Sequence, residues 1–73
     1  MARYKVVCTE SDYAYTFDSL SDAETAAGNH NRRKGHAPIN IYELDDLAEL
    51  TRDQLLACLI PDPHLGILNI YAV

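Results

Sequence analysis

Hydrophobic and polar positions alternate over two short stretches near the start of the chain. Residues 3–9 place Tyr4, Val6 and Cys8 on one face, and the charges of Arg3 and Lys5 predict that the other face is the wetter one. Residues 13–17 (Tyr-Ala-Tyr-Thr-Phe) alternate again, with aromatic residues on one face. This period of two is typical of strands, and the polar run between the stretches suits a turn. We therefore predict a β-hairpin in which Cys8 points toward the core.

The next segment has helical periodicity instead. Its inward stripe is predicted to comprise Leu20, Ala23, Ala26, Ala27 and His30. Ser21 and Glu24 have the spacing of a capping box, which predicts that the helix begins at Ser21. Gly35 is the left-handed residue that commonly ends a helix. Because the stripe consists mainly of alanines, we expect this helix to lie close to a sheet.

The second half of the chain predicts two more strands and one more helix. Residues 39–44 and 67–73 carry apolar side chains on both faces, and residues 51–60 open with the capping box Thr-Arg-Asp-Gln. The apolar side of this helix is predicted to comprise Leu55, Leu56, Leu59 and Ile60. We therefore expect a single α+β domain over residues 1–73, in the order ββαβαβ. Its antiparallel sheet would have about four strands, with both helices packed on one face.

Charge narrows the class of partner. The 73 residues include eleven acidic and six basic side chains, which give a formal charge of −5. Proteins that bind phosphate backbones usually carry the opposite sign, so direct binding of nucleic acid is not expected. No apolar run approaches the roughly 20 residues of a membrane span, and no secretory signal opens the chain. We therefore expect no membrane contact, a cytoplasmic location and two reduced cysteines.

A run of acidic residues is the first candidate binding site. It comprises Glu43, Asp45, Asp46, Glu49 and Asp53. Such a run is most often a solvated face. It also suits a basic partner, including a protein that itself binds nucleic acid. We treat these five residues as candidate contacts for a protein partner.

The last predicted strand is the second candidate. Residues 67–73 (Ile-Leu-Asn-Ile-Tyr-Ala-Val) carry apolar groups on both faces and no charge. A strand with one solvated face reads apolar and polar in turn, and a solitary edge strand normally carries a charged residue. The strand could be covered on both faces, pair with a second copy of the chain, or bind another protein. Because only two helices are expected to cover the sheet, we predict an exposed apolar patch with Ile67, Tyr71 and Val73 as contacts.

Catalysis has little support in the sequence. Cys8 and His30 suggest a thiol–imidazole pair, but an inward strand cysteine in a domain too small for a cleft is seldom a nucleophile. His64 has no obvious partner in its Pro-Asp-Pro-His segment. The three glycines are scattered and form no phosphate-binding loop. We expect no enzymatic activity.

Cys8, His30 and His36 have the layout of a small zinc-binding unit: a cysteine in a hairpin, a histidine late in the helix and a histidine after it. Residues 4–36 therefore resemble the two-Cys, two-His zinc-finger family. The family's second cysteine would fall at Ser11, which does not replace it. The resemblance implies a finger-like ββα unit whose metal was lost or was never there, with Cys8, His30 and His36 as the candidate zinc ligands. We expect the domain to fold without zinc.

These observations together favour a small non-catalytic interaction protein that binds a macromolecular partner and regulates or inhibits it. Its size and charge are similar to those of small acidic accessory proteins of viruses and mobile elements, including inhibitors of host defence complexes. No motif underlies that similarity. The last strand also allows a homodimer. The alternative is a zinc-finger-like regulator that contacts nucleic acid.

Overall fold

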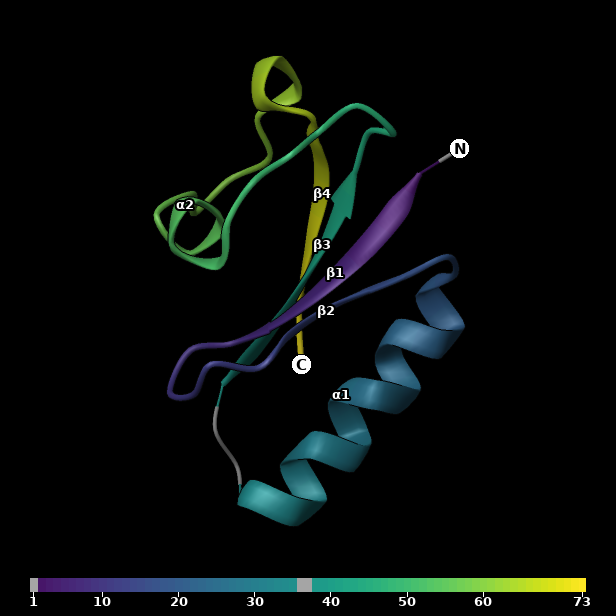
Figure 1. Ribbon diagram of the computed structural model, residues 1–73, viewed down its shortest axis with the longest axis vertical. Coiled ribbons are helices and arrows are strands. Elements are labelled where there is room, and N and C mark those ends of the chain that lie inside the picture. Colours follow the sequence, from purple (N-terminus) through teal and green to yellow (C-terminus); the bar gives the residue numbers. More distant parts are fainter. Residues whose placement is uncertain (1, 36–37) are drawn as a thin grey trace.

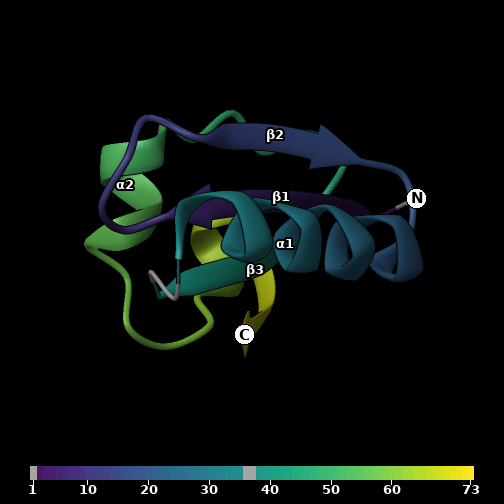
Figure 2. The same ribbon diagram turned by 90° about the horizontal axis from the view of Figure 1, so that it is seen from below.

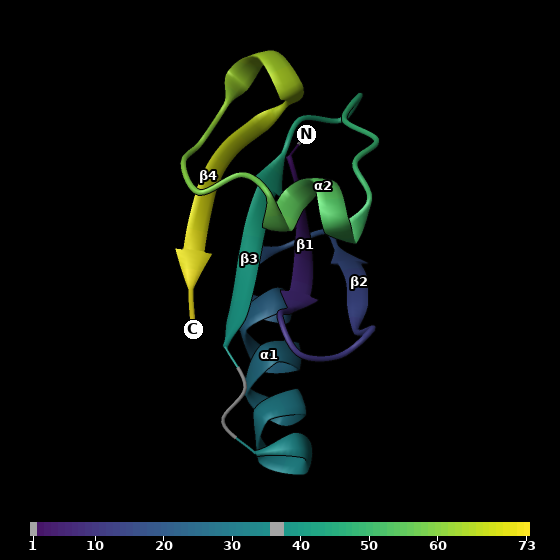
Figure 3. The same ribbon diagram turned by 90° about the vertical axis from the view of Figure 1, so that its left-hand side faces the viewer.

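The computed structural model describes residues 2–35 and 38–73. The elements, in chain order, are β1 (Arg3–Cys8), β2 (Ala14–Phe17), α1 (Leu20–Lys34), β3 (Ile39–Leu44), α2 (Arg52–Leu56), the short 3-10 helix η1 (Pro63–Leu65) and β4 (Ile67–Ala72). The strands form one antiparallel sheet in the order β2-β1-β3-β4 (Figures 1 and 3). The predicted α+β class and the order ββαβαβ are confirmed.

The predicted hairpin is formed by β1 and β2. Tyr4 pairs with Phe17 and Val7 pairs with Ala14 in its register. Cys8 is buried, as predicted, and its N–H donates to the carbonyl of Tyr13 at 3.1 Å where the strands approach the turn. The hairpin therefore fixes the face on which every side chain of β2 lies.

Helix α1 begins earlier than predicted. Ser19 is the N-cap, and its hydroxyl accepts a hydrogen bond from the N–H of Asp22 at 3.2 Å. Ser21 and Glu24 are exposed within the first turns, so the capping box predicted for them is wrong. Two serines lie two positions apart here, and the cap forms at the one whose backbone is extended. Gly35 ends the helix with φ of 81°, as predicted.

The two helices lie on opposite faces of the sheet (Figure 1), so the prediction that they share one face is wrong. The buried cluster on the α1 face comprises Val6, Cys8, Ala23, Ala27, Ile39 and Ile41. The buried cluster on the α2 face comprises Val7, Tyr42, Leu44, Ala48, Leu55 and Ile67. Alternate residues of β1 and β3 enter the two clusters, which explains why both strands carry apolar residues on both faces.

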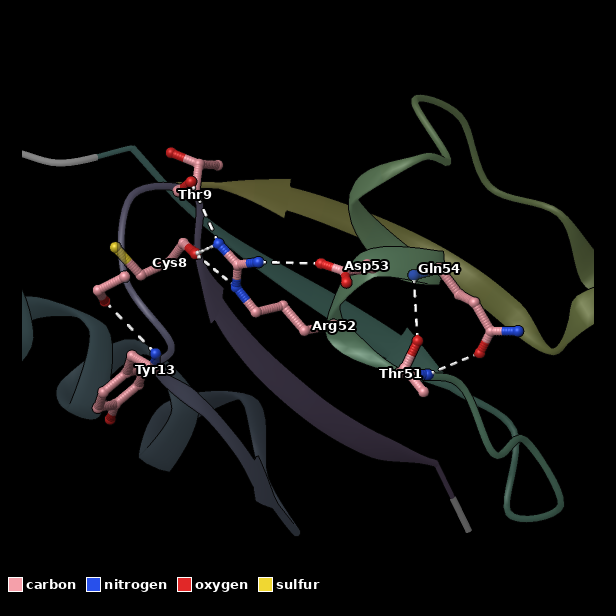
Figure 4. Close-up of polar contacts among 8 residues, drawn as sticks. Cys8, Thr9, Tyr13, Thr51, Arg52, Asp53 and Gln54 are labelled. Atoms are coloured by element: carbon pink, nitrogen blue, oxygen red, sulfur yellow. Dashed lines mark hydrogen bonds and ion pairs between the residues drawn. The ribbon is translucent and has the colours of Figure 1, made fainter.

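Helix α2 is shorter than predicted. Its capping box is confirmed, because Thr51 Oγ1 accepts from the N–H of Gln54 at 3.3 Å and Gln54 Oε1 accepts from the N–H of Thr51 at 2.8 Å (Figure 4). Leu55 is fully buried. Leu59 and Ile60 lie beyond the helix and are 88% and 74% exposed, so their predicted place on its buried side is wrong.

Polar contacts attach the α2 segment to β1. The Arg52 guanidinium donates to the carbonyl of Cys8 at 3.1 and 3.3 Å and to that of Thr9 at 3.2 Å (Figure 4). From the strand, Lys5 Nζ donates to the carbonyl of Leu50 at 2.9 Å, and the Arg3 guanidinium donates to the carbonyl of Ala48. Arg3 and Lys5 therefore hold the segment between β3 and α2 against this face of the sheet, which the sequence predicted to be the wetter one.

Candidate functional site

Strand β4 forms one edge of the sheet (Figure 3). The N–H of Val73 donates to the carbonyl of Ile39 at 2.9 Å. In an antiparallel pair, alternate residues turn their backbone groups toward the partner strand. The N–H and C=O groups of Ile70 and Ala72 therefore point away from the sheet. They are available to a further strand.

The side chains of this edge are unusual for an exposed strand. No charged residue lies between Leu65 and Val73, and no proline or lysine interrupts β4. Leu65, Leu68 and Val73 are 45%, 38% and 52% exposed. The register shifts opposite Glu43 and leaves Leu68 as the extra residue of a bulge. Apart from that bulge, β4 has none of the charged or proline residues that usually protect an edge.

The structure separates the three contacts predicted on the last strand. Ile67 is fully buried in the α2-face cluster, so its prediction as a surface contact is wrong. Tyr71 is half-buried against the α1-face cluster, and its hydroxyl donates to Glu43 Oε1 at 3.0 Å. That bond, followed by burial, raises the pKa of Tyr71. Val73 alone among the three is exposed.

The predicted acidic run does not form one uniform surface. Glu43 is half-buried on β3, where Oε1 accepts from Tyr71 and from Asn69 Nδ2 at 3.4 Å. Asp53 is on α2 and pairs with Arg52 at 3.0 Å. These two residues therefore lie on different elements from the rest of the run.

The other three acidic residues share the loop between β3 and α2. Asp45, Asp46 and Glu49 are exposed there. Asp45 Oδ1 accepts from the N–H of Leu47 at 3.0 Å, which shapes the turn. The N–H of Asp45 donates to the carbonyl of Gly66 at 2.8 Å, so the acidic loop begins beside the start of β4. The structure thus brings part of the predicted acidic site next to the predicted site on the last strand.

The Cys8 thiol is enclosed by the turn of the hairpin. Burial raises its pKa, but hydrogen bonds from the Ser11 side chain and from the backbone of Glu10 and Ser11 favour the thiolate. The hydrogen bonds outweigh burial, so the pKa of Cys8 lies below its ordinary value. Ser11, at the position where the predicted resemblance to a zinc finger would require a second cysteine, is therefore one of the residues that lower the pKa of Cys8.

The predicted zinc ligands are only partly described. His30 lies against Tyr13, with ring centroids 4.3 Å apart. His36 lies outside the described residues. Within residues 2–35 and 38–73, no group of three or more His, Cys, Asp or Glu side chains is placed to hold a metal ion. The described part of the chain does not by itself supply the four ligands that zinc prefers. The zinc-finger resemblance stays a prediction.

A cleft between β2 and the later turns of α1 was missed by the sequence analysis, which expected no room for one. Its volume is about 430 Å³, and it is lined by Tyr13, Tyr15, Phe17, Ala26, Asn29, His30 and Arg33. A hollow of about 560 Å³ continues from it toward the hairpin turn and shares Tyr13, Tyr15, His30 and Arg33. The aromatic alternation of residues 13–17 was a signal for its strand wall, but the helix wall depends on tertiary packing.

Two further findings bear on the class of the protein. Among the described residues, no helix has the length and apolar character needed to cross a membrane. Neither a protein-family model, nor a curated protein, nor a solved structure matches the chain. The functional interpretation therefore rests on the geometry of the fold.

Proposed function

We propose that the protein is a small non-catalytic binding module that attaches to a protein partner through the β4 edge and regulates or blocks that partner. The observation that carries this proposal is an uncharged edge strand whose outward backbone groups, at Ile70 and Ala72, lie beside exposed Leu68 and Val73. Proteins generally protect such edges. An unprotected edge favours a partner that extends the sheet by a strand.

Exposed apolar side chains on the segment that leads toward β4 support the proposal. Leu59 and Ile60 lie on the loop between α2 and η1, which runs beside β4 in Figure 3. The end of that loop is fixed to the strand, because Asp62 forms a bridge with Ile67. Adjacent exposed apolar residues mark interaction surfaces more often than scattered ones do.

The acidic loop adds a preference for partner charge. Asp45, Asp46 and Glu49 are exposed on a loop that is bonded to the start of β4 through Gly66. Acidic side chains at the rim of an apolar contact attract a basic partner and speed association. The partner favoured by both features is a protein with an exposed strand edge and basic groups beside it.

Partner capture from the source cells tests this function. The double variant Leu68→Lys, Val73→Lys adds two cations to the β4 edge, and we expect it to reduce capture of the partner at least tenfold. Both side chains are already exposed, so the melting temperature should change little. The matched control Thr25→Lys, Ala57→Lys adds the same charge at exposed positions outside the strands of the sheet. Equal capture by the two double variants would show that the β4 edge is not the binding surface.

A further inference from the structure

Strand β2 forms the opposite edge of the sheet (Figure 2). Because the N–H of Cys8 donates to the carbonyl of Tyr13, the backbone groups of Tyr13 and alternate residues turn toward β1. Those of Ala14 and Thr16 therefore point away from the sheet. An extended peptide can form main-chain hydrogen bonds with these groups.

The aromatic cleft lies directly beside this edge, on the α1 face. Tyr15, which is 60% exposed, packs edge-on against Tyr13 with ring centroids 4.8 Å apart. Tyr15 and Phe17 share the face of Tyr4 and Val6 in the hairpin register. A peptide strand laid along β2 would direct every second side chain over the same face, and hence over the cleft.

An unpaired polar atom lies in the wall of the cleft. His30 is only 8% exposed, and its Nε2 has no hydrogen-bond partner among the described residues. The same side chain lines both parts of the cleft. Leaving a buried polar atom unpaired is unfavourable, so a ligand acceptor that reaches it gains affinity. Because Nε2 is buried, the side chains that cover it must shift before a ligand group can reach it.

The charge of the cleft favours an anionic group. Arg33 is exposed and lines both parts of it. Burial raises the pKa of Tyr13, and the positive charge of Arg33 partly opposes that shift. Asp12 lines only the part near the hairpin turn, so an acidic ligand group is best placed in the other part, where Arg33 is the charged side chain of the lining. That part of the cleft presents a cation on a chain with a net charge of −5.

We infer that the β2 edge and its cleft form a second binding site, which takes an extended peptide and holds one of its carboxylate side chains between Arg33 and His30. The free edge supplies the main-chain contacts, and charge complementarity selects the side chain. This site is separate from the β4 edge. A single-stranded nucleic acid, which would stack its bases on Tyr15, is the competing occupant.

A titration of the isotope-labelled full chain with three synthetic peptides tests the inference. The acidic probe is acetyl-Ser-Thr-Val-Glu-Val-Thr-Ser-amide, and its twins carry Gln or Lys in place of Glu. We expect the acidic probe to shift the amide signals of residues 14–17 and the later turns of α1, together with the imidazole signals of His30. Its affinity should exceed that of the Gln twin at least fivefold, and the Lys twin should bind most weakly. A ten-residue uridine oligonucleotide should cause no shifts.

Two variants on the same helix turn provide a matched pair. Arg33→Glu should weaken the acidic probe at least tenfold and reverse the preference toward the Lys twin. Arg32→Glu makes the same change of charge at an exposed position that does not line the cleft, and it should change the affinity less than threefold. The β4 variant Leu68→Lys, Val73→Lys should bind the probe normally, so this test and that of the proposed function fail independently.

Several results would overturn the inference. They are equal binding of the three peptides, no binding of any peptide at millimolar concentration, equal effects of the two arginine variants, and signal shifts confined to β4. Binding of the uridine oligonucleotide in place of the peptides would assign the cleft to nucleic acid instead.

Discussion

The two edges of the sheet present the same backbone groups and very different side chains. The β4 edge is six residues long and uncharged, with exposed Leu68 and Val73. The β2 edge is four residues long and adjoins an aromatic cleft that contains Arg33. Main-chain hydrogen bonds alone would not distinguish a partner at one edge from a partner at the other. The side chains around each edge therefore determine what it binds.

The two edges also differ in how the fold supports them. Beside β2, the hairpin turn is bonded to α2 through Arg52. At the start of β4, the chain passes through η1 and Gly66, whose carbonyl accepts from Asp45. Each support can be removed separately, so the contribution of each to its edge can be measured.

The largest effect is expected at Gly66, where β4 begins. Its φ is 87°, and an added Cβ would lie 2.7 Å from the Cβ of Ala48. Gly66→Ala should lower the free energy of unfolding by about 2–4 kcal/mol, because backbone strain and overpacking add. Denaturant unfolding measures this change, and hydrogen exchange should show faster exchange in β4 than in β2.

Gly28 provides the control for that substitution. It lies within α1, and an added Cβ would meet nothing within 4 Å. Gly28→Ala should therefore stabilise the protein by about 0.5–1 kcal/mol through helix propensity. If Gly66→Ala is as stable as the native chain, the start of β4 does not have the strained geometry described above.

The second effect concerns the support of the β2 edge. Arg52→Met keeps most of the aliphatic stem and removes the bonds to the carbonyls of Cys8 and Thr9. The loss should be about 1–2 kcal/mol, with faster hydrogen exchange in the hairpin turn and little change in β4. Arg32→Met, at an exposed position, should be nearly neutral. Equal stability of the two variants would contradict a structural role for Arg52.

The third effect is on association at the β4 edge. Asp46 and Glu49 are exposed on the acidic loop, so Asp46→Lys, Glu49→Lys should leave the fold intact. Association with the captured partner should slow by roughly 3- to 10-fold at low salt and become less dependent on salt. Stopped-flow mixing at several ionic strengths measures both quantities. An unchanged rate would leave the loop as a solvated surface.

The smallest effect concerns one tyrosine beside each edge. Burial is the main cause that raises the pKa of Tyr13, whereas the bond to Glu43 is the main cause for Tyr71. Glu43→Gln should therefore lower the pKa of Tyr71 and leave that of Tyr13 unchanged, which NMR titration of the ring carbons measures. A Tyr71 pKa that does not respond would show that the Glu43 bond is not its cause.

The raised pKa values of Tyr13 and Tyr71 also determine how the stability of the fold changes at alkaline pH. Both phenols have a higher pKa in the folded protein, so they contribute stability below the ordinary tyrosine pKa of about 10. That contribution is lost as pH rises through the folded values. In Glu43→Gln, the loss assigned to Tyr71 should be smaller and should be complete at lower pH, because the folded pKa lies closer to the unfolded one. Denaturant unfolding at a series of alkaline pH values measures this change.

The sequence predicted the parts of the fold that depend on local interactions. The hairpin follows from alternation within a few residues, and the capping box of Thr51 and Gln54 from side chains three positions apart. Gly35 has the positive φ that its place after α1 requires. The cap of α1 was misplaced because Ser19 and Ser21 are both suitable residues and only the backbone distinguishes them.

The remaining features depend on contacts between distant segments. Leu59 and Ile60 continue the spacing of Leu55, but Ile60 precedes a proline, which disfavours helical backbone. The bridge between Asp62 and Ile67 then draws the chain toward the sheet. Likewise, the charge of Lys5 predicted a wet face. Its ammonium instead donates to the carbonyl of Leu50, in the loop between β3 and α2.

The candidate site shows the same division. The absence of charge in residues 67–73 was visible in the sequence, and it led to the β4 edge. The burial of Ile67 was not visible, because the bulge at Leu68 changes which residues face the core. The cleft beside β2 needs both the hairpin register and the position of α1, and neither is encoded in a single segment.

Hydrogen exchange in the complex with the captured partner tests the central claim most directly. The amides of Ile70 and Ala72 point away from the sheet in the free protein, and a partner strand at the β4 edge would bond to them. We predict that binding slows their exchange at least tenfold, while the amides of Ala14 and Thr16 change little. Unchanged exchange at Ile70 and Ala72 in a fully formed complex would contradict the account.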